Sequence, residues 1–357
     1  MSTLELMDEL TDRVRGCSGP KLGARMLTNK FKKIIVWGYP LYSHTHSFIH
    51  YGWFKAFSSL GHETYWFHDK DYPADFDYRG ALFITEGFAD ENIPLEPSAT
   101  YAVHVCKDPA KYLNCGAKLL DVRFNLKKTK DFTYDYTLDH SKTLAIDEVT
   151  RYEEKTSDAV LVDRYRTGVS GYSALYMVWA TDMLPHEINL DDALIARDRV
   201  VHHVGSRWSA NGNELYQFQK ALEKVGIGFV VHDPWQKVTS NEEAKALVQR
   251  SYIAPDIRGA GPTCSGSTAE ECNHLTNGYI PCRVFKNISY GHLGVTNSQA
   301  VKNLMQDYVV YSDDVDLLLQ EATPYLKDTC KIQEAMKYVQ AYHTYYNRID
   351  CLLKVLE

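Results

Sequence analysis

The sequence predicts an α/β protein built from two domains, each organised around a parallel β-sheet. The chain has 357 residues, which suits two domains of ordinary size. Short apolar runs, typical of buried strands, alternate with helical segments in both halves of the chain. The composition, with 45% apolar and 24% charged residues, is that of a globular protein.

The first domain is predicted from a strand–loop–helix–strand unit in the N-terminal half. An amphipathic helix over 2–15 comes before it. An apolar strand at 33–38 leads through a loop to a helix over 47–60, and a second strand occupies 63–68. This order of elements is Rossmann-like. Further strands are expected at 81–85, 100–105 and 118–122.

The second domain is predicted to follow the break at Pro185, where acidic residues begin. It has the pattern of another α/β unit, and a long helix with an apolar face ends the chain. Strands are expected at 199–205, 227–232, 252–255, 293–296 and 308–311, and helices at 213–225, 240–250, 312–325 and 329–356. We therefore assign residues 1–190 to the first domain, 191–330 to the second and 331–357 to a C-terminal helix.

The segment 278–297 has the form of a phosphate-binding unit. A loop closed by Pro281 enters a short helix over 283–290, and an apolar strand follows. The first turn of a helix offers N–H groups and a positive dipole end to an anion. Arg283 and Lys286 add two cations. Any loop–helix–strand unit of an α/β domain shares the backbone pattern, so a purely structural role stays open.

Two motifs in the C-terminal half resemble glycosyltransferases of the GT-B type. FKNISYGHLGVTN, at 285–297, is similar to the F-E-A-hydrophobic-x-x-G-x-hydrophobic-hydrophobic-T/S segment that faces the donor in that family. HTYYNRIDCLL, at 343–353, resembles the H-T-Y-x-x-R ending of a related group, the CgeB-like proteins. The chain thus looks like a member of the CgeB-like or glycosyl transferase group 1 C-terminal domain families.

The resemblance implies two Rossmann-like domains that face each other across a cleft, with the C-terminal helix crossing back to the first domain. A UDP-, GDP- or dTDP-sugar donor would bind the second domain, and a glycan or other hydroxyl acceptor the first. Retaining families carry two glutamates in the donor segment, and Gly278 and Lys286 stand at those positions here. The resemblance therefore favours an inverting reaction that needs no metal.

Donor contacts are expected at three places in the second domain. Ser206 and Arg207 follow its first strand, although Arg207 could equally be a solvated loop residue. The nucleoside is expected near 252–256, against the strand ends. The predicted donor-binding residues are Ser206, Arg207, Tyr252, Ile253, Tyr279, Arg283, Val284, Phe285, Lys286 and Asn287.

The first domain carries the candidate general bases. His44, His46 and His50 cluster after its first strand, and His46 is favoured because it lies at the loop–helix junction. Glu86 follows an apolar strand, where burial is expected to raise its pKa and let it act as a base. A metal site or a helix cap are the alternatives for the histidines, and a cap for Glu86. Asp90 is a weaker candidate in the same loop.

Composition disfavours several other functions. The formal charge of −7, without a long basic run, argues against nucleic-acid binding. No apolar run is long enough to span a bilayer, and eight scattered cysteines suit a reduced, cytoplasmic setting. The D-x-D pair Asp69 and Asp71 comes too early in the chain for the metal-binding role that such pairs have in GT-A enzymes, so a solvated loop is expected there. No metal and no other cofactor are predicted.

These observations together predict a glycosyltransferase with His46 and Glu86 as catalytic residues. A nucleotide-sugar epimerase on the same scaffold and a catalytically inactive sugar- or nucleotide-binding protein are the alternatives. A dehydrogenase is less favoured, because no G-x-G-x-x-G motif follows the first strand.

Overall fold

The computed structural model describes residues 30–123, 173–207, 211–259, 274–275 and 279–356. The chain divides into two compact units: unit 1 comprises Met1–Leu184 with Thr344–Glu357, and unit 2 comprises Pro185–His343. The division after Leu184 lies slightly before the boundary at 190 expected from the sequence. The predicted helix over 2–15 and Gly278 lie outside the described residues.

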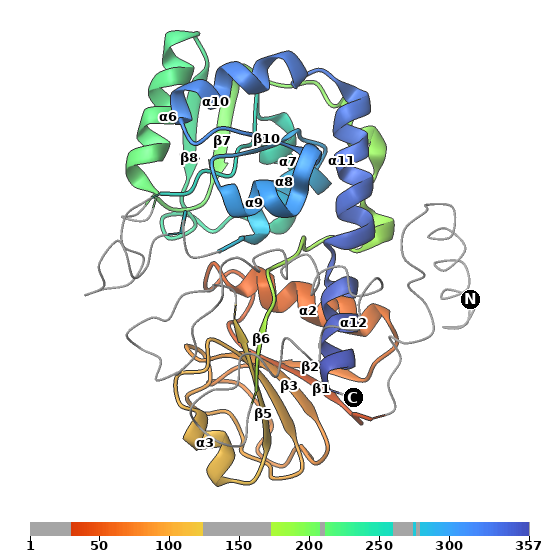
Figure 1. Cartoon of the computed structure of the whole chain (residues 1–357). Helices are drawn as coiled ribbons and strands as arrows, with labels where there is room; N and C mark the ends of the chain where they lie inside the picture. Colours follow the sequence, from red (N-terminus) through yellow and green to blue (C-terminus); the bar gives the residue numbers. More distant parts are fainter. Residues whose placement is uncertain (1–29, 124–172, 208–210, 260–273, 276–278, 357) are drawn as a thin grey trace. The chain divides into compact units, whose positions relative to one another are not determined.

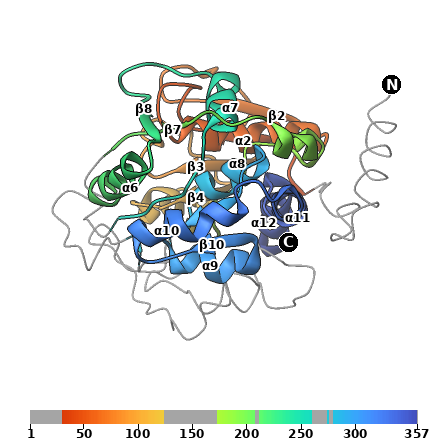
Figure 2. The same ribbon diagram turned by 90° about the horizontal axis from the view of Figure 1, so that it is seen from above.

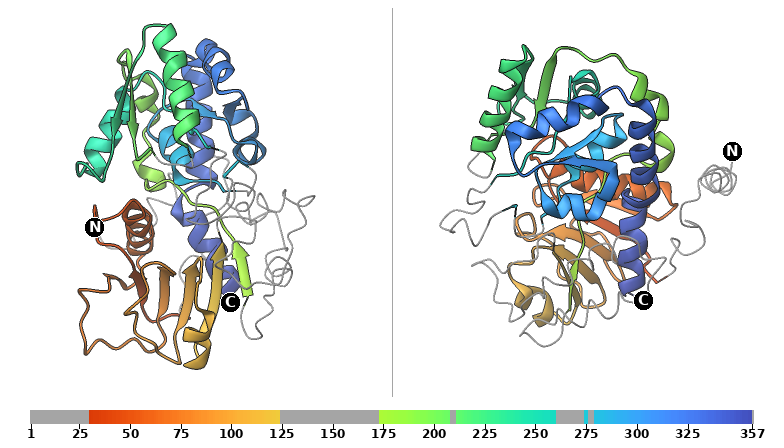
Figure 3. Two further views of the ribbon diagram at one scale, coloured as in Figure 1. Left: turned by 90° about the vertical axis from the view of Figure 1, so that its left-hand side faces the viewer. Right: turned by 45° about the horizontal axis from the view of Figure 1, so that its top comes forward.

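Unit 1 is built on a six-stranded, all-parallel sheet with the order β2-β1-β3-β4-β5-β6 (Figure 1). Figure 3 shows these strands side by side. The strands are β1 (Ile34–Trp37), β2 (Thr64–Phe67), β3 (Leu82–Glu86), β4 (Thr100–His104), β5 (Lys118–Arg123) and β6 (Ser173–Tyr176). β1, β3 and β4 are buried along their whole length, as expected for apolar runs covered on both faces of a parallel sheet. The parallel sheet predicted for the first half of the chain is confirmed.

The strand order of unit 1 reverses next to β1. The chain adds β2 on one side of β1 and then places β3 on its other side. The connections that leave β1 and β3 therefore diverge at the carboxyl ends of these strands, and open parallel sheets bind ligands at such a switch point. In unit 1 the switch point is formed by loop 38–46 and by Glu86, the last residue of β3.

The helices of unit 1 are α2 (Ser47–Ser59), α3 (Pro109–Asn114) and α12 (Tyr345–Leu356). α12 packs against α2 (Figure 1). The Tyr345 and Trp53 rings lie 5.0 Å apart between centroids. Gly52 allows this approach, because a Cβ there would lie 2.3 Å from the Tyr345 ring.

Unit 2 contains two parallel strand pairs, β7–β8 and β9–β10. The strands are β7 (Val200–Val204), β8 (Gly228–His232), β9 (Gly294–Thr296) and β10 (Val309–Tyr311). Segment 251–256 lies between the pairs: the N–H of Tyr252 donates to β7 and that of Asp256 donates to β9. The sequence predicted a strand at 252–255, but Pro255 has no N–H to donate, and an isolated bridge at Asp256 forms instead.

Helices pack on the strands of unit 2, with α6 against β8 and α7 against β7 (Figure 2). The α-helices are α6 (Gly212–Lys224), α7 (Asn241–Arg250), α8 (Cys282–Ser289), α9 (Gln299–Met305), α10 (Val315–Ala322) and α11 (Thr329–Tyr342). Short 3₁₀ turns are η3 (Pro185–Glu187), η4 (Leu190–Leu194), η5 (Gln306–Tyr308) and η6 (Thr323–Tyr325). Within the described parts of both units, no helix combines the length and the apolar character needed to cross a membrane.

The end of the chain forms two helices, whereas the sequence predicted one helix over 329–356. α11 belongs to unit 2 and α12 to unit 1, and the break falls at His343 and Thr344. The N–H and the hydroxyl of Thr344 both donate to Asn347 Oδ1, at 2.9 Å each. The Asn347 side chain thus accepts the N–H of the residue that precedes α12, as the third-residue side chain does in a capping box, so Thr344 begins a new helix instead of continuing the old one.

The H-T-Y-x-x-R motif has a structural role in unit 1. Arg348 is buried, and it donates from Nε to the Val178 carbonyl and from Nη2 to the Trp179 carbonyl, both at 2.9 Å. Thr344 forms an isolated bridge with Thr181 of the same segment. The motif therefore anchors α12 to the chain that follows β6.

Candidate functional site

Both residues predicted as catalytic, His46 and Glu86, meet at the switch point of unit 1. Glu86 ends β3 and is 3% exposed. His46 immediately precedes α2, and its Nδ1 lies 2.9 Å from Glu86 Oε2. The two residues are 40 positions apart in the sequence. They come together because β1 and β3 are parallel neighbours whose carboxyl ends open at the same edge of the sheet.

The hydrogen bond to Glu86 determines what His46 can do. Because the carboxylate accepts, Nδ1 of His46 carries the proton, and the Nε2 lone pair is left to accept one. The His46 side chain is 31% exposed, so it remains reachable from solvent. His46 stands at the N-cap position of α2 but makes no side-chain capping bond, which rules out the capping role considered for it.

His44 and His50 have structural partners. His44 Nδ1 accepts the N–H of His46 at 3.1 Å, which orders the turn before α2. His50 is buried, and its Nδ1 accepts the N–H of Tyr39 at 3.0 Å. His50 Nε2 lies 3.6 Å from Glu86 Oε2, the same carboxylate oxygen that His46 contacts.

The electrostatics assign different roles to His46 and Glu86. Burial by itself would raise the pKa of Glu86, but neighbouring histidines, His46 first among them, hold it down to about 2. The predicted rise in the pKa of Glu86 was therefore wrong. The fold brings histidines from distant parts of the sequence next to Glu86, and their effect on its pKa exceeds that of burial. Burial also acts to lower the pKa of His46, and the Glu86 carboxylate outweighs this, so the pKa of His46 is raised. Glu86 is the charged anchor, and His46 is the group that can accept a proton.

The more deeply buried rings of this cluster stay neutral. Burial lowers the pKa of His50 to about 4 and that of His104 to about 3. Trp179 covers the group, with its ring centroid 4.5 Å from His104 and 6.1 Å from His46. Among His46, His50 and His104, His46 is the ring whose pKa is raised, because its contact with the Glu86 carboxylate outweighs burial.

His44, His46 and Glu86 form a group that could hold a metal ion. One ligand atom from each lies within 4.8 Å of the other two. The sequence spacing shows no carboxylate partner for the histidines, and the fold supplies Glu86. The expectation that the protein needs no metal stays a prediction.

In unit 2, the predicted phosphate helix α8 starts close to the carboxyl end of β7. Arg283 Nη1 donates to the Val204 carbonyl at 2.8 Å. Gly205 follows with φ +141°, and a Cβ on it would lie 2.3 Å from Arg283 Nη2. The backbone conformation favours glycine at that position, and the Arg283 guanidinium occupies the space that a side chain would need. Pro281 precedes α8 and offers no side-chain cap for its first turn.

A second arginine, Arg258, joins this region although the sequence analysis does not single it out. It is 8% exposed, and its Nε donates to Asp256 Oδ1 at 2.9 Å. The Asn297 side chain bonds both the N–H and the carbonyl of Arg258, at 2.7 Å each. Burial acts to lower the pKa of Arg258, and Asp256 raises it on balance. Its sequence signal is its position just after the expected nucleoside segment 252–256.

A buried histidine shows how positive this edge of unit 2 is. His203 of β7 is 5% exposed, and its pKa is lowered well below its ordinary value by burial and then by Arg283, Arg207 and Arg258. Its Nε2 has no hydrogen-bond partner within the described residues. The carboxyl end of β7 therefore concentrates positive charge, which suits a phosphate.

Several of the predicted donor residues are used by the fold. Ile253, Val284 and Phe285 have buried core side chains, so a donor could meet them only through their backbone. Ser206 Oγ donates to Asp233 Oδ1 at 2.8 Å and so ties together the loops after β7 and β8.

Polar residues of the predicted donor set also have partners within unit 2. The exposed Arg207 donates to Gln219 Oε1 at 2.6 Å, and the buried Asn287 amide donates to the Ala254 carbonyl at 2.8 Å. Lys286 is half-buried near the Tyr290 ring.

Two half-buried tyrosines of the donor set, Tyr252 and Tyr279, complete the list. The Arg258 guanidinium lies 5.7 Å from the centre of the Tyr279 ring. That Tyr252 and Tyr279 contact a nucleoside stays a prediction.

Two acidic residues of unit 1 have structural roles. Asp69 accepts from Trp37 Nε1 at 2.9 Å and from the Asn92 N–H at 3.1 Å, so the expectation of a solvated loop is wrong for it. Asp90 accepts the hydroxyl of Tyr112 and is not part of the His46 group.

No protein-family model matches the chain, and no curated protein matches it. Among solved structures, one described as an α-glucosyltransferase in complex with UDP and a 13-mer DNA containing a HMU base is similar to it. The match has a TM-score of 0.51 and covers 90% of this chain and 100% of that chain. At 8% sequence identity the likeness is one of fold. The chain has a mixed α/β fold with parallel sheets that is similar to the fold of a glycosyltransferase.

Proposed function

We propose that this chain is a glycosyltransferase of the GT-B type that moves a sugar from a nucleoside diphosphate sugar to a hydroxyl group. Unit 2 binds the donor, and unit 1 binds the acceptor. The observation that carries the proposal is the 2.9 Å contact of His46 with Glu86, because it offers a proton acceptor at the switch point of a parallel sheet. The likeness of fold to a glycosyltransferase directs the choice of reaction.

The proposed reaction is a single in-line displacement. The acceptor oxygen forms a bond to the anomeric carbon while the bond from that carbon to the diphosphate breaks, and the nucleoside diphosphate leaves with the bonding electrons. His46 Nε2 takes the acceptor proton, while Glu86 holds Nδ1–H and stabilises the imidazolium that forms. The displacement inverts the anomeric configuration, and this step uses no metal.

The donor diphosphate is proposed to lie at the carboxyl end of β7. Arg258 and Arg283 would offset the charge that grows on the leaving group, together with the first turn of α8 and Lys286. Fixed cations suit this task because they need no reorganisation as the charge develops. The reaction requires the two sites to serve one donor–acceptor pair, and a crystal with bound nucleoside diphosphate and acceptor would test this.

The acceptor is proposed to be a glycan, in a cytoplasmic setting. The DNA in the solved structure described above suggests a second class, a hydroxyl on a modified base. The formal charge of −7 disfavours a polyanionic acceptor, because neutralising phosphates requires a positive surface. Both classes belong in the acceptor assay.

A thermal-shift panel of UDP-, GDP- and dTDP-sugars tests donor binding, because a bound ligand stabilises the folded chain by mass action. The sugar nucleotide that stabilises the chain is then incubated with glycan and DNA acceptors, and the products are identified by mass spectrometry. Transfer to an acceptor supports the proposal. Binding without turnover identifies a binding protein, an isomerised nucleotide sugar identifies an epimerase, and no stabilisation by any member of the panel contradicts the proposal.

A further inference from the structure

We propose that His44, His46 and Glu86 bind a divalent transition-metal ion of the zinc class, and that this ion blocks proton transfer to His46. The binding stands on the geometry of unit 1 alone. The blocking effect rests on the function proposed above. The site would make sugar transfer sensitive to zinc although the transfer step itself uses no metal.

The spacing of the three side chains is close to that of a zinc site. Their ligand atoms lie within 4.8 Å of one another, and His46 Nδ1 is already 2.9 Å from Glu86 Oε2. Tetrahedral zinc with bonds near 2 Å holds its ligand atoms roughly 3.4 Å apart. His44 and His46 are both half-buried in the loop before α2, so rotation of their rings can close the difference.

A second observation points to a ligand at this place. Glu86 is buried, and within the described chain its Oε1 atom has no hydrogen-bond partner. A buried carboxylate oxygen without a partner is unfavourable, and a bound cation satisfies it. Two imidazoles and one carboxylate, with a further position open to solvent, form a ligand set that zinc uses in proteins.

The bound ion would prevent His46 from taking the acceptor proton, and so would block the proposed reaction. A metal bound through His46 Nδ1, the atom that faces Glu86, leaves the ring proton on Nε2, so Nε2 has no lone pair to take the acceptor proton. Metal and proton acceptance therefore compete for the same side chain. His44 belongs to the proposed metal site but not to the proposed proton transfer, and its Nδ1 accepts the N–H of His46 and orders the turn.

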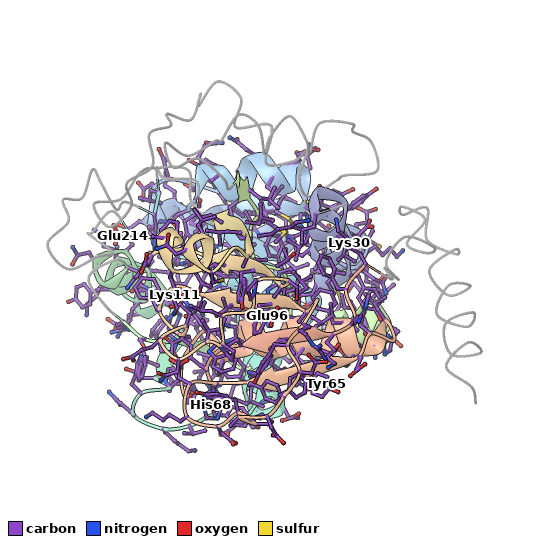
Figure 4. The ribbon with its side chains drawn as sticks, turned by 90° about the horizontal axis from the view of Figure 1, so that it is seen from below. Lys30, Tyr65, His68, Glu96, Lys111 and Glu214 are labelled. Atoms are coloured by element: carbon purple, nitrogen blue, oxygen red, sulfur yellow. The ribbon has the colours of Figure 1, made fainter. Side chains whose placement is uncertain are left out.

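This difference provides a clean variant, His44→Asn. The amide oxygen of Asn can accept the N–H two residues further along the chain, so it preserves the turn while removing the imidazole ligand. His68, labelled in Figure 4, offers a matched control, because its Nδ1 accepts the N–H of Lys70 in the same way. His68→Asn therefore repeats the same chemical change away from the proposed site.

The test is equilibrium dialysis of the full chain against zinc chloride, with thermal melting to verify that each variant folds. We expect saturable binding of one zinc per chain, at least tenfold weaker binding by His44→Asn, and unchanged binding by His68→Asn. An absence of saturable binding, or equal affinity of His44→Asn and the wild type, would overturn the site.

The blocking effect is measured in the transfer assay. Zinc should inhibit the wild type and His68→Asn, while His44→Asn should stay active at the same zinc concentration. Zinc bound through His44 without inhibition would overturn the blocking effect alone. If no transfer is found with any donor, the proposed function fails, whereas the dialysis result still decides whether the metal site exists.

Discussion

Units 1 and 2 place opposite chemistry at the same position of a parallel sheet, the carboxyl ends of the strands. In unit 1 histidines surround a single carboxylate, which raises the pKa of His46. In unit 2 burial and then three nearby arginines lower the pKa of His203. The sheet supplies the position, and the charge at its edge decides whether that position handles a proton or binds an anion.

The comparison predicts that loss of the base affects turnover far more than donor binding. His46→Gln keeps an N–H for Glu86 but removes the proton acceptor, so kcat should fall by roughly 10²–10⁴. The dissociation constant for the donor should not change, because the proposed donor contacts belong to unit 2. Steady-state kinetics and calorimetry measure the two quantities. Full turnover by His46→Gln would remove His46 from the mechanism.

The converse change is made in unit 2. Arg283→Ala removes a cation from the end of β7 and should weaken binding of the nucleoside diphosphate roughly 10–100-fold, the usual loss for a charged hydrogen bond. The pH dependence of transfer should stay as it is. Arg199→Ala is the control, because Arg199 is an exposed arginine of the same unit. Equal affinities of these two variants in calorimetry would contradict the phosphate assignment.

A finer test concerns the anchor of the base. His46 accepts a proton only when neutral, so kcat/KM should fall with decreasing pH through its pKa, which Glu86 raises. Glu86→Gln makes the imidazolium less stable and lowers that pKa, so the inflection should move to lower pH. The maximal rate should fall roughly tenfold as orientation of the ring is lost. An inflection at the same pH in the variant would show that Glu86 does not control His46.

The smallest expected effect concerns the stability of the fold and tests a buried histidine that has no proposed role in the reaction. His292 of unit 2 is buried with Nε2 2.6 Å from the Val248 carbonyl, and burial, followed by Arg197, lowers its pKa to about 3. Below the pKa of His292 in the unfolded chain, the unfolded chain binds more protons than the folded one. The contribution of the neutral His292 to stability is therefore complete above about pH 6.5 and is lost as the pH falls.

His292→Gln preserves an N–H donor without a titrating ring. Between about pH 8 and pH 6, the wild type should lose about 0.8 kcal/mol more free energy of unfolding than this variant. Urea unfolding of both proteins at the two pH values measures the difference. An equal loss in both proteins would mean that His292 is not held neutral by the fold.

Most helices and strands could be predicted from the sequence because their signals are local. Apolar runs marked β1, β3 and β4, and the amphipathic period marked α6. Gly291, at φ +96°, ends α8 as its position in the motif predicted. The sequence did not show where α12 is anchored, because this depends on Arg348 donating to carbonyls about 170 residues earlier in the chain.

For the candidate site, too, some features follow from the sequence and others only from the fold. The sequence alone determined which residues end apolar strands or begin helices, and this was enough to select His46, Glu86 and Arg283. Only the tertiary structure paired His46 with Glu86, reversed the expected pKa of Glu86 and brought Arg258 to Arg283. The physical reason is range: secondary structure follows from neighbours a few residues away, whereas a pKa follows from charges a few ångströms away, wherever they lie in the chain.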